Sequence, residues 1–305
     1  MNRYKISTIF IVLIVIFASG SFANDTVRLT MKFQKGQFDK YRMTMKTTIK
    51  MPDMPGVPKK PIVSSVSMTM NQRVVDIYSD GSAKIRTSYS NISMDSNIGV
   101  VPKNLNLASE PITYVIFPDG RLKDIYGMEN LAGNISEFDF SGIINQMNMS
   151  SYFPQRELIK GDSWTIDMPI PWSNNPFYMI STILSTNESV NSITAAKIQQ
   201  SFKGNIDIGE MMKNIGEAAA AQTSSSGQNS DILSMMSNMI SSINGEVNLK
   251  GWNILYFSPN LGRMLKSNGV TEGDITIFLP KQATNQGMPS KLKMDLKINV
   301  DVKRI

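Results

Sequence analysis

The sequence predicts a mainly β protein of the α+β class, built as a curved antiparallel sheet or half-open β-barrel with covering helices. Three observations lead to this fold class: long stretches of alternating apolar and polar residues, short turns rich in Gly, Pro, Asp and Asn, and a few segments with helical apolar spacing. A sheet with one apolar face needs another layer over that face. We expect residues 24–305 to form a single β-rich domain, since a chain of this length can bury one large core.

Residues 1–23 are predicted to be a secretory signal peptide. Two basic residues, Arg3 and Lys5, precede an apolar run at 9–18, and small residues lead up to a cleavage site after Ala23. We therefore expect the protein to be exported to a bacterial periplasm, with full secretion as the alternative. An uncleaved membrane anchor is disfavoured because the apolar run is short for a membrane-spanning helix.

Alternation predicts most strands of the first half of the chain. The clearest case is 41–51, where Met43 and Met45 share one face and basic or Thr residues fill the other. The alternation slips near Arg73-Val74, which predicts a bulge. Strands are predicted, in order, at 27–34, 41–51, 62–78 and 82–94, followed by a hairpin at 112–127.

The second half of the chain contains both helix-like and strand-like spacing of apolar residues. Helices are predicted at 128–147, 209–221 and 231–243, with a polar linker at 222–230. The helix–linker–helix segment 209–243 is expected to be mobile, either as a lid or as an insertion without a role. Further strands are predicted at 164–166, 177–186, 190–208, 246–258, 263–268, 274–279 and 292–302.

Two turns have similar sequences although they lie far apart in the chain. "FPDGR" at 117–121 resembles "FSPNLGR" at 257–263: in both, Phe and Pro precede an Asp or Asn, and Gly-Arg follows. Turn chemistry alone accounts for such a match, because Pro, Asp, Asn and Gly each favour turn conformations. The other interpretation is a pseudo-duplicated sheet, and both interpretations remain open at this point.

Composition excludes several kinds of active site. The chain contains no Cys and no His, which removes His/Cys zinc sites, thiol nucleophiles and Ser-His-Asp triads. Ser163 in "GDSW" therefore has no histidine base, and the acidic residues are scattered singly. We expect no enzyme activity, no cofactor and no metal.

The charge balance also limits the partners. The formal net charge is +6 for the chain, or +4 without Arg3 and Lys5. This charge is too diffuse in sequence to predict nucleic-acid binding. Membrane contact is expected to be transient at most.

The methionines favour a site for an apolar ligand. There are 22 of them, and unbranched thioethers form a deformable surface suited to lipid chains. The alternative for each is plain core filling. The predicted lining is Met43, Met45, Met68, Met70, Trp164, Met235, Met239, Trp252, Met294 and Leu296.

Two other functions remain as alternatives. A filled interior would favour a structural or protein-interaction role at the cell envelope. Soft thioethers also select Cu(I), and copper ligands would be Met51 with Met54, or Met235 and Met236 with Met239. However, the second set also has the spacing of an apolar helix face.

Several of these features together resemble a known group. The signal peptide, the Met/Thr-rich strands, "FPDGR", "KGDSW" after a proline and the late "FSPNLGR" resemble bacterial proteins of unknown function related to the LolA-like lipoprotein carriers. The resemblance implies a half-open β-barrel whose helices plug an apolar cavity, and a role in carrying a lipid, with an envelope protein as a further partner. Many relatives carry a lipidated cysteine, which this chain lacks, so no lipid tether is implied. No catalytic residue carries over.

Overall fold

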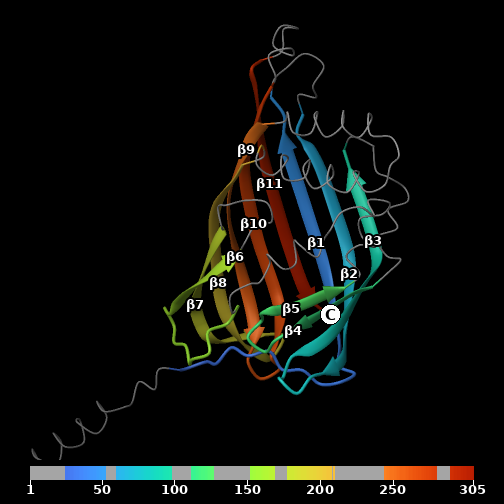
Figure 1. Ribbon diagram of the computed structural model, residues 1–305, viewed down its shortest axis with the longest axis vertical. Helices are drawn as coiled ribbons and strands as arrows, with labels where there is room; N and C mark the ends of the chain where they lie inside the picture. The colour runs from blue at the N-terminus through green and yellow to red at the C-terminus, as the bar shows by residue number, and fades with distance from the viewer. Residues whose placement is uncertain are drawn as a thin grey trace, which may run out of the picture.

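The computed structural model describes residues 25–52, 60–97, 111–126, 152–168, 177–207, 209, 244–279 and 289–305. These residues form one antiparallel sheet of 11 strands, shown in Figure 1. The strands are β1 (Phe38–Lys50), β2 (Ile62–Ile77), β3 (Ala83–Ser96), β4 (Ile112–Ile116), β5 (Leu122–Tyr126), β6 (Ser163–Met168), β7 (Phe177–Val190), β8 (Ile193–Asp207), β9 (Asn244–Ser258), β10 (Arg263–Phe278) and β11 (Lys291–Arg304).

The mainly β class is confirmed, and the sheet is open. Its order is β5-β4-β3-β2-β1-β11-β10-β9-β8-β7-β6, so β5 and β6 are the two edges. The structure does not support the covering helices, because Gly209 is the only helical position among the residues it describes. The helices predicted at 128–147, 209–221 and 231–243 lie outside the described residues, apart from Gly209, and so does the predicted signal peptide.

Most of the alternating stretches do form strands. The predictions at 41–51, 62–78 and 82–94 correspond to β1, β2 and β3, and the hairpin at 112–127 corresponds to β4 and β5. The predicted bulge is also present, because the register between β2 and β3 shifts between Val74 and Asp76. These segments fold as expected because one apolar face per strand is buried and the other is polar.

One strand was predicted as two. Residues 263–268 and 274–279 are parts of a single strand, β10, which runs through Gly269 and Gly273. Both glycines lie inside the strand at places of close approach. A Cβ on Gly273 would stand 2.5 Å from Leu249 Cδ2, and one on Gly269 would stand 2.7 Å from the Trp252 carbonyl oxygen. Gly here accommodates neighbours rather than ending the strand.

The strand predicted at 27–34 is wrong. This segment is extended and buries Val27 and Leu29, but it forms only an isolated bridge between Val27 and Leu158. Its other backbone bonds go to turns: the Met31 N–H donates to the Pro118 carbonyl at 2.8 Å, and the Lys32 N–H donates to the Gly262 carbonyl at 3.2 Å. Alternation identified its buried face but not its partners.

Residues 25–33 and 152–158 together form what we call the end cap. Figure 1 shows the first of these segments running along the end of the sheet where the C-terminus of the chain lies. The two related turns are fastened to the cap, since the Pro118 and Gly262 carbonyls accept its N–H groups and the Phe153 N–H donates to the Asp119 carbonyl at 2.9 Å. The related turn sequences therefore serve a common packing role.

The main core lies between the end cap and β7, β8 and β9. Phe153 of the cap packs against Phe257 of β9, with ring centroids 4.8 Å apart. The buried cluster is Val27, Leu29, Phe153, Leu158, Ile183, Ala196, Ile198, Leu255 and Phe257. Burying such side chains is the main source of stability in a fold of this kind.

The strand order also bears on the pseudo-duplicated sheet. β1 to β5 form one meander and β6 to β10 form a second, and β11 lies between them. Across the sheet, the two meanders have the corresponding orders β5-β4-β3-β2-β1 and β10-β9-β8-β7-β6. All neighbouring pairs are antiparallel, so corresponding strands, such as β5 and β10, run in the same direction. The order is compatible with the pseudo-duplicated sheet, which is one of the two interpretations of the related turns.

Candidate ligand-binding face

The inner face of the sheet is the face that packs against the end cap. Side chains alternate along each strand, so residues two apart share this face. On β1 it begins with Asp39 and Tyr41 and continues with Met43 and Met45. The strand register sets Met43 opposite Met68 of β2 on one side and opposite Val302 of β11 on the other. Methionines and valines from three adjacent strands therefore form one apolar surface.

This apolar surface continues beyond the core toward the far end of the sheet. Leu296 pairs with Ile49 of β1, and Met294 pairs with Ile275 of β10. The core cluster is almost fully buried, whereas Met43 and these farther side chains are only half-buried. The inner face thus has a filled end at the cap and a longer apolar stretch of intermediate burial.

A cavity of about 260 Å³ lies where the sheet meets the end cap. Met70 of β2, Tyr114 of β4 and Leu255 of β9 all line it, although β4 and β9 lie far apart in the strand order. The sheet must therefore curve to bring these strands around one space. The lining is mostly apolar or aromatic, with a few polar groups, which is the usual make-up of a small-molecule pocket.

Two tyrosine hydroxyls with defined partners border the cavity. The Tyr41 hydroxyl donates to the Met264 carbonyl at 3.3 Å, and Gln72 donates from Nε2 to the Tyr114 hydroxyl at 2.7 Å. Burial raises the pKa of both tyrosines, and the nearby Asp39 carboxylate adds to the effect at Tyr41. Both hydroxyls are therefore neutral polar groups at physiological pH.

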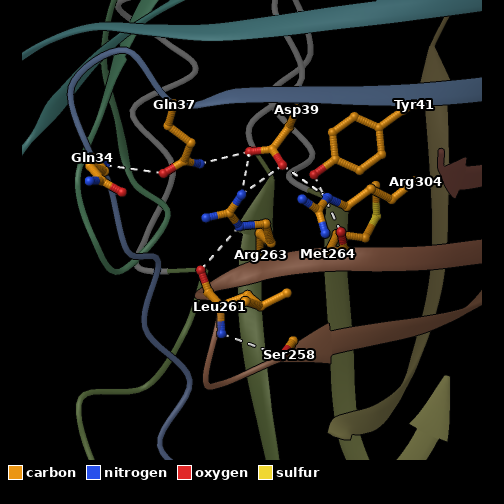
Figure 2. Close-up of polar contacts among 9 residues, drawn as sticks. All are labelled: Gln34, Gln37, Asp39, Tyr41, Ser258, Leu261, Arg263, Met264 and Arg304. Atoms are coloured by element: carbon orange, nitrogen blue, oxygen red, sulfur yellow. Dashed lines mark hydrogen bonds and ion pairs between the residues drawn. The ribbon is translucent and has the colours of Figure 1, made fainter. Parts of the chain in front are cut away.

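A charge network around the buried Asp39 carboxylate, shown in Figure 2, lies beside the cavity, and Asp39 and Arg263 are among the residues that line it. Asp39, whose side chain is 7% exposed, accepts bonds from Arg263 Nη1 at 2.7 and 3.0 Å and from Arg304 Nε at 2.9 Å. Gln37 Nε2 donates to the same carboxylate at 2.7 Å. The network joins β1, β10 and β11 at the cap end of the sheet.

The pKa of the Asp39 carboxyl reflects this environment. Burial alone raises that pKa, but the hydrogen bonds from Gln37 and Arg263 and the charges of Arg263 and Arg304 outweigh burial and hold it below its usual value. Two guanidinium groups face one carboxylate here. A net positive charge therefore remains beside an otherwise apolar cavity.

Sequence reasoning missed a polar row on the inner face. Gln200 of β8 is 2% exposed and donates from Nε2 to the Tyr152 hydroxyl at 2.7 Å, while its Oε1 accepts from Asn253 Nδ2 at 2.9 Å. Asn253 in turn accepts a bond from the Ser267 hydroxyl at 2.7 Å. Inward amides break the apolar alternation, and no local signal separates them from outward ones.

Seven of the ten predicted lining residues have described positions on the inner face. Met70 lines the cavity, and Met43, Met45, Met68, Met294 and Leu296 lie farther along the same face. Trp164 is also inward but packs against the core, with its Nε1 donating to the Tyr152 carbonyl at 2.9 Å.

One of the other three predicted residues, Trp252, does not join them. Trp252 lies on the outer face of β9, is 46% exposed, and pairs with Ser201 and Val270. Its predicted place in the lining is therefore wrong, because β9 presents Asn253 and Leu255 inward instead. Met235 and Met239 lie outside the described residues.

The described residues show no arrangement typical of a metal centre. Across them, no three His, Cys, Asp or Glu side chains gather as a metal-binding group. Of the methionines considered for Cu(I), Met51 is described, whereas Met54, Met235, Met236 and Met239 are not. In the same parts of the chain, no helix has the length and hydropathy needed to cross a bilayer.

Comparisons with known proteins give only distant likenesses. No protein-family model and no curated protein matches the sequence. A solved structure described as lipid–protein interactions in lipovitellin aligns with 88% of this chain at 10% identity and a TM-score of 0.42, and this chain spans only 25% of that one. DynF, from the dynemicin biosynthesis pathway of Micromonospora chersina, aligns over 92% of this chain and 85% of its own at 10% identity, with a TM-score of 0.19. Scores at this level do not establish a shared function.

Proposed function

We propose that this protein binds or carries a lipid or another apolar molecule on the inner face of its sheet, without catalysis. One observation carries the proposal. The apolar inner face extends well beyond the filled core, and a cavity of about 260 Å³ opens at the boundary between the two. An extended apolar surface in a soluble fold is unfavourable in water unless something covers it.

The chemistry of the face supports an apolar ligand of variable shape. Met43, Met45 and Met68 are half-buried and adjacent, and Met70 reaches the cavity. Thioether side chains adjust their rotamers at little cost, so such a surface adapts to flexible chains. Each methylene group that a ligand transfers from water to this surface contributes about 0.8 kcal/mol.

The residue types present support a role without catalysis. The chain has no His and no Cys, and the buried carboxylate nearest the cavity, Asp39, is held by two arginines. A carboxylate fixed in this way is a poor general base, because its pKa lies below the usual value. We also propose a LolA-like half-open barrel, which the open sheet and its curvature support. Export to the periplasm is proposed from the sequence of residues 1–23 alone.

The decisive experiment is native mass spectrometry of protein purified from cells, followed by titration with a fluorescent apolar probe, N-phenylnaphthylamine. We expect a co-purifying lipid and saturable probe binding. Met43→Asp and Met294→Asp should each weaken probe binding about 5- to 150-fold, the range for an unpaired polar group in an apolar contact.

Thr44→Asp is the matched control for these variants. Thr44 neighbours Met43 on β1 but lies on the exposed outer face, so its substitution should leave probe binding unchanged. Circular dichroism checks that each variant is folded. A folded wild-type protein that carries no lipid and binds no probe would refute the proposal and favour a structural or protein-interaction role at the envelope.

A further inference from the structure

The outer face of the sheet carries an excess of basic side chains on its middle strands. It is strongest on β1 and β11, which are adjacent at the middle of the sheet. On these two strands the outward residues include eight exposed basic side chains and two exposed acidic ones: Lys40, Arg42, Lys46, Lys50, Lys291, Lys293, Lys297 and Lys303 against Asp295 and Asp301.

The strand register sets like charges directly beside one another. Arg42 of β1 is opposite Lys303 of β11, and Lys303 is opposite Lys266 of β10. The row continues through Tyr256 of β9 to Lys197 of β8, whose ammonium group lies 5.8 Å from the Tyr256 ring centre. Like charges at opposed positions destabilise a sheet, so this row works against folding. An anionic surface would relieve that repulsion.

A second basic row crosses the same strands farther along. Lys297, Lys250 and Lys203 are aligned there, and Glu272 between the first two binds both, at 3.0 and 3.7 Å. A depression of about 580 Å³ on this face is lined by four lysines, these three and Lys50, and by the carboxylates of Glu272, Asp274 and Asp295. The two rows are six residues apart along β8, or about 20 Å.

Exposed apolar side chains lie between the two basic rows. Trp252 is 46% exposed, and Ile180, in the same row of the register, is 49% exposed. Tyr178, which pairs with Lys203 of the second basic row, is 51% exposed. Trp and Tyr favour the interface between lipid headgroups and water. Lysine stems accompany such side chains there because their charged ends stay in water.

We propose that this outer face docks on the surface of a bilayer rich in anionic phospholipids. The basic rows would contact the headgroups, and Trp252 with Ile180 would enter the interfacial layer between them. This surface lies opposite the proposed ligand-binding face, and the inference does not depend on that function. Attraction of this kind is reversible and depends on ionic strength.

The test is sedimentation of the full chain with unilamellar vesicles, either equimolar phosphatidylglycerol and phosphatidylcholine or phosphatidylcholine alone. We expect binding to the anionic vesicles that weakens steeply between about 0.01 M and about 0.15 M salt. The neutral vesicles measure any contribution of the apolar segment 1–23, which all variants share.

The double variant Lys266→Glu, Lys303→Glu should weaken binding to anionic vesicles by at least about 25-fold, taking about fivefold for each basic residue lost. Its control is Lys60→Glu, Lys160→Glu, an identical change of charge at exposed positions off the sheet, which should bind like the wild type. Trp252→Phe should remove the blue shift of tryptophan emission on vesicle binding.

Three results would overturn the proposal. These are equal affinity for both kinds of vesicle, equal loss in both double variants, and binding to heparin or DNA without binding to anionic vesicles. Probe binding to the inner face, measured on the same samples, separates this inference from the proposed function. A protein that binds vesicles but not the probe would refute only the ligand proposal, and the reverse result would refute only the docking proposal.

Discussion

Replacing Gly262 by alanine is expected to loosen the end cap from the sheet. Gly262 has a φ of +64°, and a Cβ at this position would overlap the backbone nitrogen of Lys32. The positive φ alone costs an alanine about 1–2 kcal/mol. The overlap also forces the cap away and weakens the bond from the Lys32 N–H to the Gly262 carbonyl, which adds about 1 kcal/mol or more. We therefore expect a total loss of about 3 kcal/mol.

Gly36→Ala is the matched control for this prediction. Gly36 has a φ of +80°, but no atom lies within 4 Å of the position that a Cβ would occupy. Its alanine variant should lose only the conformational cost of about 1–2 kcal/mol. Urea denaturation followed by circular dichroism gives the free energies of unfolding of both variants. If the two alanine variants lose the same stability, the close approach of the cap to the turn contributes nothing and the reasoning is wrong.

Three further predictions concern the charge network and the core. Asp39→Asn should lower the free energy of unfolding by about 3–5 kcal/mol, since it leaves two arginines without their buried partner. Asp76→Asn, at an exposed ion pair, should lower it far less, and urea denaturation compares the two variants. Because the folded-state pKa of Asp39 lies below the unfolded value of about 3.9, the contribution of its ionised carboxylate to stability is complete above about pH 5. This contribution is lost as the pH falls through the unfolded value toward the folded-state pKa. In an acid titration, the stability of Asp39→Asn should therefore decline less steeply than that of the wild type. Phe153→Ala should cost about 3–5 kcal/mol by leaving a cavity against Phe257, and a thermal melt equal to that of the wild type would contradict this core assignment.

The individual strands were largely predictable from the sequence, but their neighbours were not. Alternation of apolar and polar residues found β1, β2, β3 and β11 within a few residues of their bounds. Alternation says that a strand has two faces, and nothing in it indicates that β11 pairs with β1. The segment around Val27 shows the limit, since it alternates like a strand but bonds mainly to turns.

The candidate site was predictable in part for the same reason. Met43 and Met68 were assigned to one face from their spacing, and the register confirms that they are opposed. Trp252 was assigned from its residue type alone, and its strand turned it outward. Gln200 and Asp39 were missed because burial of a polar side chain depends on partners that are distant in sequence.

The place of β11 has a consequence for how this chain reaches its folded state. β1 is completed by the last strand of the sequence, and the bond from Arg304 to Asp39 spans 265 positions. Closing so long a loop is slow, and topologies dominated by distant contacts fold slowly. Until β11 has been synthesised, β1 and β10 each lack a neighbour on one side and expose an unpaired row of backbone groups. The nascent chain is therefore prone to aggregate before β11 is made, and it should depend on a holding chaperone up to that point.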